Sequence, residues 1–417
     1  MQPKQYLMTL RLFTAILILS VFFSCKKSED TGFEPTAPFL MKKQVFAVPG
    51  TDEDPVSSVA TPAGVKIAGN NGNSGSTNFH STTLTTTGDF AADTWKAITQ
   101  TSGKAYNKCN RIEKLNDGNF VMLGTAGNSP ADREAYAVVV DASGNYVKHY
   151  NTDNPGASEF NSAVILSDGS MIIAGSSSGF PDVNGEITGE MDFYLVKLDA
   201  SLTMAWQKNY GTVWSDGAVK IVPFDNNQVY YVLGYTDTDI DNLRQLLLLR
   251  INNVGDSIWG KMYGTENDDE PRDIIRTEDD NHVILSSVSG DNKYLQFYKI
   301  EPTINGRDQW LGTGKWDTGK DIDAYQLITH PTPVWVGGAV LAVGYGYALG
   351  RDDEDMMVLK FNLSFDNETA MYTIGEAEFN ERGKTAVEVS DGVMIIGYKT
   401  DRVGNTNKDL FAAKIRK

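Results

Sequence analysis

Short apolar runs, separated by turns rich in Gly and Asp, recur along the chain, and the clearest set lies between positions 167 and 211. There the pair Asp168-Gly169 precedes an apolar run at 171–175, a loop leads to a second run at 192–199, and a third run contains Trp206. Apolar runs of roughly four to eight residues bounded by turn residues are typical of β-strands. The pattern therefore predicts a unit of short strands joined by tight turns.

This unit recurs along the sequence. Equivalent positions are 64, 118, 169, 227, 280, 338 and 392, and the spacings are 54, 51, 58, 53, 58 and 54 residues. No unit contains an apolar stripe of helical period long enough for a helix, which excludes helical solenoids. Units of this length with four short strands and small turns are typical of propeller blades. We predict an all-β fold, a seven-bladed β-propeller with four antiparallel strands per blade.

The two ends of the repeat region are complementary. The last unit ends at Lys417 after its third strand, so its outer strand is missing on that side. Residues 42–50 and the following 51–54 resemble residues 260–264 and the following 265–269, which belong to an outer strand and the next loop. We predict that 42–50 supplies the missing outer strand, so that the propeller comprises 42–417 and leaves no open blade edge.

The N-terminus has the features of a targeting signal. Lys4 and Arg11 precede an apolar run of 12 residues that ends before Ser24 and Cys25. This run is shorter than the roughly 20 residues of a membrane-spanning helix, and its arrangement is that of a secretory signal peptide. A Cys directly after the cut site resembles a bacterial lipobox. Phe22 departs from that pattern, because Leu, Val or Ile is usual at its position.

We therefore expect 1–24 to be a lipoprotein signal peptide, Cys25 to carry a lipid such as palmitate, and 25–41 to be a flexible tether. The alternative is a plain signal peptide with a chance Cys. Glu29 and Asp30, diluted by Lys26 and Lys27, resemble the surface-export signal of some Gram-negative lipoproteins. We expect an outer-membrane protein, lipid-anchored and displayed at the cell surface of a Gram-negative bacterium.

The charge balance narrows the range of partners. The chain has 37 Lys and Arg against 54 Asp and Glu, a formal charge of −17. Without 1–24 it keeps 35 cations against 54 acids, which gives −19. Binding to nucleic acid needs clustered Lys and Arg, so we expect no nucleic-acid partner. Two cysteines exclude a disulfide-rich scaffold, and we expect Cys109 to be a small buried side chain.

The repeat resembles a known family. Its Asp-Gly turn, apolar strand and Gly, followed by Asp192-Phe-Tyr-Leu-Val-Lys-Leu-Asp199 and Trp206-Gln-Lys-Asn-Tyr-Gly211, are similar to repeats in bacterial secreted and lipoprotein β-propellers. The resemblance covers about residues 42–417. The first unit departs from it because it has no Asp-Gly turn, and the fifth because Ser287 replaces Gly. The resemblance implies the fold and extracytoplasmic binding, and little more.

The repeated tryptophans and the loop residues have different expected roles. We expect Trp206, Trp259 and Trp310 to share one register of the outer strand and to pack between blades. The loops between second and third strands and those between blades open on one face, which should be acidic. We expect this face to bind a protein partner or a glycan; the alternative is that its acids cap turns and its aromatic residues plug the channel mouth. The candidate residues on this face are Trp214, Trp316, Tyr345, Tyr347, Asp216, Asp269, Asp321 and Asp323.

One loop could hold a cation. Asp237, Asp239 and Asp241 alternate along the chain, and carboxylates in such a loop can converge on Ca²⁺, which takes 6–8 oxygen ligands. The Gly and the distal Glu of an EF-hand loop are missing, since Asn242 follows the third acid. A solvated loop is the alternative, and we expect no other cofactor.

Motifs for catalysis are weak. None of the four histidines, His80, His149, His282 and His330, lies beside a Ser-Gly or Cys motif of a nucleophilic enzyme. Our leading hypothesis is a surface lipoprotein that acts as a non-enzymatic binding or assembly module. One alternative is an extracellular carbohydrate-active enzyme with paired loop carboxylates, which need be only about 5–10 Å apart in space. Another is an accessory subunit of an outer-membrane transport or secretion complex.

Overall fold

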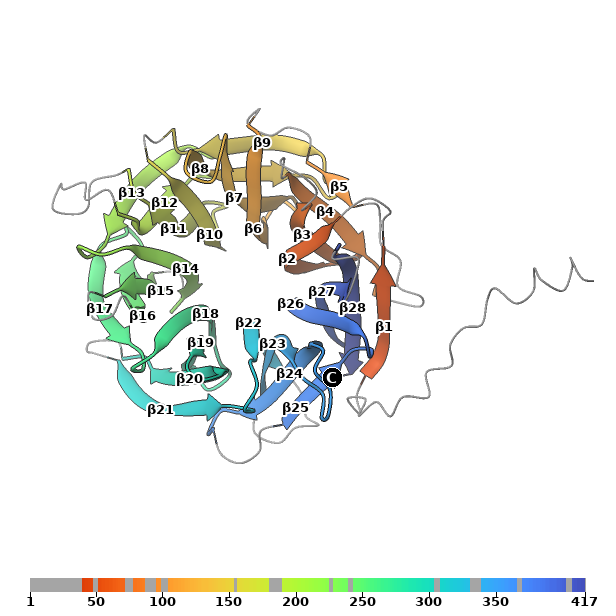
Figure 1. Ribbon diagram of the computed structural model, residues 1–417. Coiled ribbons are helices and arrows are strands. Elements are labelled where there is room, and N and C mark those ends of the chain that lie inside the picture. The colour runs from red at the N-terminus through yellow and green to blue at the C-terminus, as the bar shows by residue number, and fades with distance from the viewer. Residues whose placement is uncertain are drawn as a thin grey trace, which may run out of the picture. The chain divides into compact units, whose positions relative to one another are not determined.

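The computed structural model shows an all-β ring of seven sheets, each with four antiparallel strands (Figure 1), which confirms the seven-bladed propeller. The described residues all belong to one compact unit. No helix in the described part of the chain is long and apolar enough to cross a membrane. The structure describes residues 40–47, 52–71, 78–86, 95–98, 104–153, 156–179, 190–224, 228–238, 243–303, 308–330, 339–365, 370–402 and 407–416.

Each blade is ordered along the chain from the channel outward, except the last. Blades one to three contain β2 (Glu53–Thr61), β3 (Gly64–Asn71), β4 (Phe79–Leu84), β5 (Lys96–Ala97); β6 (Tyr106–Lys114), β7 (Phe120–Gly127), β8 (Arg133–Val140), β9 (Tyr146–Asn151); β10 (Ser158–Ile165), β11 (Met171–Ser177), β12 (Asp192–Leu198), β13 (Met204–Tyr210). Blades four and five contain β14 (Asp216–Pro223), β15 (Val229–Asp237), β16 (Arg244–Asn252), β17 (Ser257–Tyr263); β18 (Asp268–Arg276), β19 (His282–Ser289), β20 (Lys293–Glu301), β21 (Gln309–Trp316). Blades six and seven contain β22 (Asp323–His330), β23 (Ala339–Gly346), β24 (Asp355–Asn362), β25 (Ala370–Ile374); β26 (Phe379–Val389), β27 (Gly392–Asp401), β28 (Asp409–Arg416) and β1 (Leu40–Phe46).

The ring is closed by the N-terminal strand, as predicted. β1 pairs antiparallel with β28, with Lys43 opposite Ala413 and Val45 opposite Phe411. On the inner side, the hydroxyls of Ser58 in blade one and Thr385 in blade seven form a buried hydrogen bond of 2.9 Å. Both ends of the chain therefore contribute to the last blade, and β28 keeps a hydrogen-bonded neighbour on each side.

The hydrophobic core lies between neighbouring blades. One cluster joins Val121 and Ala137 of blade two to Phe160, Ile173 and Tyr194 of blade three. Every residue of β7 and β11 is buried, whereas β13 is mostly exposed or half-buried. Strands covered on both faces read as continuous apolar runs in the sequence, which is why the second and third strands gave the clearest repeat signal.

A bulge interrupts the innermost strand of every blade at one register. The extra residue has no partner in the second strand, and such a bulge re-aims one side chain. The seven residues, called the bulge residues below, are Val56, Asn110, Asn161, Val219, Arg272, Tyr325 and Lys384.

The repeated Gly at the end of the second strand lies opposite this bulge. In blade three, Gly175 pairs with Phe160, and a Cβ on Gly175 would overlap the carbonyl oxygen of Glu159. The same overlap would occur at the equivalent glycines of five other blades. Blade five has Ser286 at this register rather than the expected Ser287, and its hydroxyl donates to the carbonyl of Glu270 at 3.3 Å. The equivalent glycines are Gly69, Gly124, Gly234, Gly344 and Gly397.

Neighbouring blades are joined where the inner strands begin. At four of the junctions between described residues, the residue three positions before the bulge donates its backbone N–H to a carbonyl at or just before the start of the third strand of the preceding blade. This bond measures 2.8 Å from Glu53 to Lys408 and 2.8 Å from Glu381 to Glu354. Ile322 makes the same bond to Lys293 at 3.0 Å. The inner strand is thus fixed to its own blade and to the preceding one.

The expected register of the tryptophans is wrong at one position. Trp206 and Trp259 occupy the same register of the outer strand, and both are half-buried. In β21, Gly312 occupies that register and Trp310 lies two residues earlier, with 41% of its surface exposed. Each of these three outer strands pairs with its neighbour through a bulge close to this point, so a count along the sequence does not give the register.

The Gly-to-carbonyl approach can be tested in blade three. Gly175→Ala should lower the free energy of unfolding by roughly 1–3 kcal/mol, because the added methyl group has no room beside the Glu159 carbonyl. Gly260→Ala is the matched control, since a Cβ there would meet Leu249 at an ordinary 3.5 Å. Denaturant unfolding of both variants measures the effect, and equal stability of the two would contradict this role of Gly175.

Candidate ligand site in the central channel

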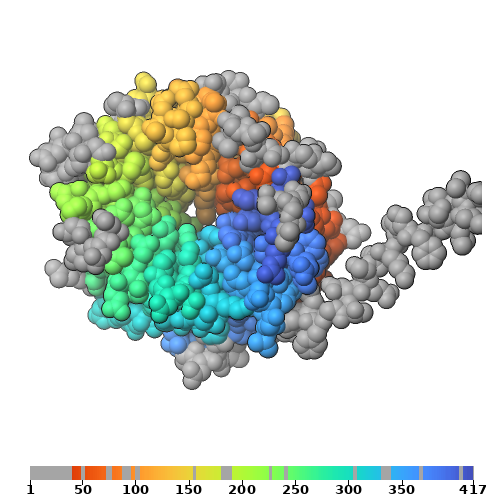
Figure 2. All heavy atoms as spheres, viewed as in Figure 1, coloured from red at the N-terminus to blue at the C-terminus, as the bar shows by residue number. Residues whose placement is uncertain are grey.

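The central channel contains a cavity of about 490 Å³, and Figure 2 shows the ring hollowed near its centre. All seven bulge residues line this cavity. The residues two positions before them lie on the same side of the inner strand, because side chains alternate along a strand. Of these, Asp54, Lys108, Glu159 and Glu270 also line the cavity. The inner strands begin at the face with the blade-to-blade loops, so the charged wall lies toward that face.

Blade four has no charged residue two positions before its bulge, and side chains from its second and third strands reach the cavity there instead. Gly217 stands where other blades have a charged residue, and a Cβ on it would lie 2.7 Å from the ring of Tyr235. Tyr235 and Arg244 reach the cavity wall here, with the guanidinium 3.7 Å from the ring centre. Arg244 is held by Asp237 at 3.0 Å and by Glu270 at 2.9 Å. This arginine is therefore already paired at the wall.

A second charged layer follows the bulge. Lys220 lies 3.3 Å from Asp273, and the other carboxylate oxygen of Asp273 accepts the N–H of Leu327 at 2.8 Å. Arg111 lies 2.7 Å from Glu113. Burial lowers the pKa of Lys220, and the nearby Arg111 lowers it further. These four side chains come from blades two, four and five, and each of the two cations is paired with an acid.

Four predicted site acids differ in burial. Asp216 and Asp269 are fully buried, and each accepts the backbone N–H four residues earlier, from Thr212 at 2.5 Å and Thr265 at 2.7 Å. Burial raises the pKa of both. They hold their loops, as the turn-capping alternative proposes. The other two are Asp321, which is exposed and accepts the N–H of Lys293 at 2.7 Å, and Asp323, which is buried and bound to Arg272 at 2.7 Å.

The four predicted aromatic residues are also divided. Trp214 is 41% exposed in the loop between blades three and four. Trp316 is the last residue of β21 rather than a loop residue, and it packs half-buried against the core between blades five and six. Tyr345 is buried 4.3 Å from the guanidinium of Arg382, and Tyr347 lies 5.1 Å from the ammonium of Lys320. None of the four is among the described residues that line the channel cavity.

The cation loop and the lipid site are only partly described. Asp237 pairs with Arg244, whereas Asp239, Asp241 and Cys25 lie outside the described residues. Within the described ranges, no three His, Cys, Asp or Glu side chains are placed to hold a metal ion. The calcium site stays a prediction. Cys109 is fully buried, as expected, and burial raises the pKa of its thiol to about 12.

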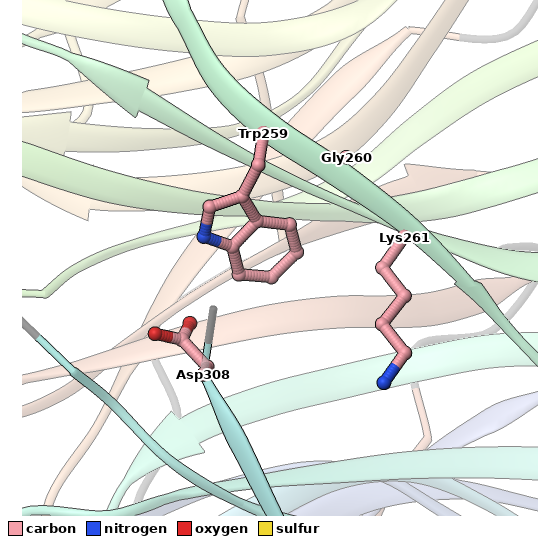
Figure 3. Close-up of a pocket in the computed structure, with 4 residues that line it drawn as sticks. All are labelled: Trp259, Gly260, Lys261 and Asp308. Atoms are coloured by element: carbon pink, nitrogen blue, oxygen red, sulfur yellow. The ribbon is translucent and has the colours of Figure 1, made fainter. Parts of the chain in front are cut away.

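A smaller cavity of about 350 Å³ lies on the outer side of blade four, where Trp259 and Lys261 extend from β17 toward Asp308 (Figure 3). Asp308 is largely committed, because it accepts from Arg250 at 3.0 Å, from the N–H of Thr303 at 2.9 Å, and from the Tyr231 hydroxyl. This carboxylate thus stabilises the junction of blades four and five. Among the described residues of its wall, Lys261 is left to face a ligand.

The comparisons with known proteins show the fold. No family model and no curated protein matches the chain. A protein of unknown function from Dyadobacter fermentans aligns over 73% of this chain and 93% of its own, at 12% identity and a TM-score of 0.47. Puromycin hydrolase aligns over 87% of this chain at 10% identity and a TM-score of 0.51, and this chain spans about half of that enzyme, 53%. The β-propeller domain of the Trilobed protease from Pyrococcus furiosus aligns over 88% of this chain and 96% of its own, at 9% identity and a TM-score of 0.43.

The buried acids at the blade junctions predict a pH dependence. Burial raises the pKa of Glu381 to about 8 and that of Glu53 to about 7. A raised pKa in the folded state contributes stability that is complete below the unfolded pKa and is lost as the pH rises through the folded pKa. The free energy of unfolding should therefore fall between about pH 5 and pH 8.

Glu381→Gln should reduce that fall, because the amide cannot ionise. Glu278→Gln, at an exposed acid, is the control and should leave the fall unchanged. Chemical unfolding at constant ionic strength measures both variants across this pH range. A fall of the same size in Glu381→Gln and in the unchanged protein would contradict the assignment.

Proposed function

We propose that this protein is a lipid-anchored binding module of the bacterial outer membrane, displayed at the cell surface, that catalyses no reaction. Its ligand enters the channel cavity from the loop-bearing face. One observation carries this proposal: in all seven blades a bulge turns one side chain into the same cavity. A volume of about 490 Å³ lies in the usual range for sites that hold small molecules.

The pairing of the wall carboxylates favours binding over glycoside cleavage. A glycosidase flanks the scissile bond with one protonated carboxyl group and one carboxylate that is free to act. Here Asp54 lies 2.9 Å from Lys408, Glu270 lies 2.9 Å from Arg244, and Glu159 lies 3.8 Å from Arg133. Acids engaged in this way suit a wall that orients charge around a ligand better than a pair that transfers protons.

The lipid anchor is supported by the sequence around Cys25. Cys25→Ser should release the protein from the membrane fraction, because the lipid is its proposed attachment. Cys109→Ser is the matched control and should leave the protein in the membrane. Fractionation followed by a salt wash measures both variants. Retention of Cys25→Ser in the membrane would contradict the anchor.

The channel site is tested by filling it. Val219→Trp adds bulk at a bulge position of blade four, and Val254→Trp, at a residue that is 52% exposed, is the control. The full chain in detergent should bind at least one member of a panel of soluble sugars, amino acids and organic acids, measured by titration calorimetry. Val219→Trp should lose that binding and Val254→Trp should keep it. Equal binding by the two variants would place the site elsewhere.

A further inference from the structure

The channel wall is positively charged although the protein is strongly acidic. Among the described residues of the wall, six are cationic and four are acidic, in a chain with a formal charge of −17. The cations are Lys108, Arg111, Lys220, Arg244, Arg272 and Lys384, and the acids are Asp54, Glu159, Glu270 and Asp273.

Ion pairs neutralise most of these charges. Each of the four acids lies within 4 Å of a cation. The pairs are Asp54 with Lys408, Glu159 with Arg133, Glu270 with Arg244, and Asp273 with Lys220. The four cations Arg111, Lys220, Arg244 and Arg272 are each paired with an acid. Within the described part of the chain, Lys108 and Lys384 form no ion pair with a carboxylate. The wall therefore carries two uncompensated positive charges.

Lys384 is the more enclosed of the two. It is half-buried, and its ammonium lies 3.6 Å from the ring centre of Tyr325 and 5.7 Å from that of Tyr398. Arg272, Tyr325 and Lys384 are the bulge residues of three successive blades, and Arg272 lies 5.4 Å from the same Tyr325 ring. The Tyr325 ring thus lies close to two cations, of which Lys384 has no described carboxylate partner, and all three residues line the cavity that a negative group could enter.

The cost of burying Lys384 explains what a ligand would supply. Burial lowers the pKa of Lys384 to about 8, which means that the protein solvates this ammonium poorly. An anion placed against it would restore the missing interaction and favour the protonated form. The charged groups that act on Lys384 are Asp54 from β2, Asp323 from β22, Arg382 from β26 and Lys408 before β28. Asp54, Asp323 and Arg382 are themselves paired, as is Lys408 through Asp54.

We propose that the channel cavity binds a small ligand through a carboxylate or phosphate group held at Lys384, with Lys108 attracting the anion at the mouth. This inference rests on the proposed binding function and names the chemistry of its ligand. The exposed Lys108 lies on the inner strand of blade two, and Lys384 lies on that of blade seven. Both flank blade one, so an anion that enters past Lys108 reaches Lys384 across the face of that blade.

Titration calorimetry on the full chain in detergent tests the inference with three probes. D-glucuronate supplies a carboxylate, inorganic phosphate supplies a phosphate group, and D-glucose is the neutral control. At pH 7 we expect at least one of the two anions to bind and glucose to give no heat of binding. Which anion binds distinguishes a carboxylate ligand from a phosphate ligand.

Lys384→Met keeps the apolar stem and removes the charge, so it should lower the affinity for the anion at least tenfold. Lys384→Arg should keep most of the affinity, which separates charge from folding. Lys261→Met, at the outer cavity, is the matched control and should bind as tightly as the unchanged protein. Loss of binding in Lys261→Met, or full binding in Lys384→Met, would overturn the assignment.

The pH dependence gives an independent readout. Since the carboxylate of glucuronate stays ionised, its affinity should fall about tenfold between pH 7 and pH 9 as Lys384 loses its proton. Unchanged affinity over that range would contradict the role of Lys384. If only neutral or cationic ligands bind, and Val219→Trp abolishes that binding, the anion inference fails and the binding function stands. If no probe or panel member binds, both fail.

Discussion

The close approach between one glycine of the second strand and a carbonyl of the inner strand is the contact on which the rest of the structure depends. The close approach occurs in every blade except blade five, where the Ser286 hydroxyl donates to the equivalent carbonyl, that of Glu270. The approach accompanies a bulge, and the bulge turns one side chain out of the sheet and into the channel. The backbone N–H three residues earlier then bonds to the preceding blade at the junctions described above. Blade packing and the wall of the cavity thus arise from one local geometry.

This geometry separates stability from recognition within a single strand. Three residues before the bulge, the side chain is buried and holds a loop or a junction, as with Asp216 and Glu381. At the bulge itself the side chain lines the cavity, and in blade one Val56 also packs against a core cluster. The bulge position holds Val, Asn, Tyr, Arg or Lys in different blades, and some of these side chains also join two blades, as Asn110 does by donating to the Phe160 carbonyl at 3.1 Å. The result is a wall with charges of both signs in which Lys384 has no described carboxylate partner.

The sequence was sufficient for the fold because the buried second and third strands repeat their apolar runs. It also predicted the closure of the last blade, because residues near 42–50 resemble the outer strand of blade four. It did not predict the register of Trp310 or the strand position of Trp316, since bulges shift the count and a strand boundary has no residue type of its own. It missed Ser286 by one residue for the same reason.

The channel residues could not be found from the sequence. The bulge residues have no single residue type in common, and they lie between 13 and 19 residues before the repeated glycine, or Ser286, of the next strand, so neither type nor spacing identifies them. Asp216 and Asp269 looked like surface acids, because a buried acid and an exposed one differ only in which side of the strand they occupy. Knowledge of the bulge register would have separated these two sets of residues.

The most direct measurement of the central claim is the titration of the Lys384 ammonium, followed by NMR of lysine labelled with ¹⁵N at Nζ, with and without D-glucuronate. We expect a pKa near 8 without the anion, well below the usual value of about 10.4, and a rise of that pKa when the anion binds. A pKa near the usual value that does not move with any anion would contradict it.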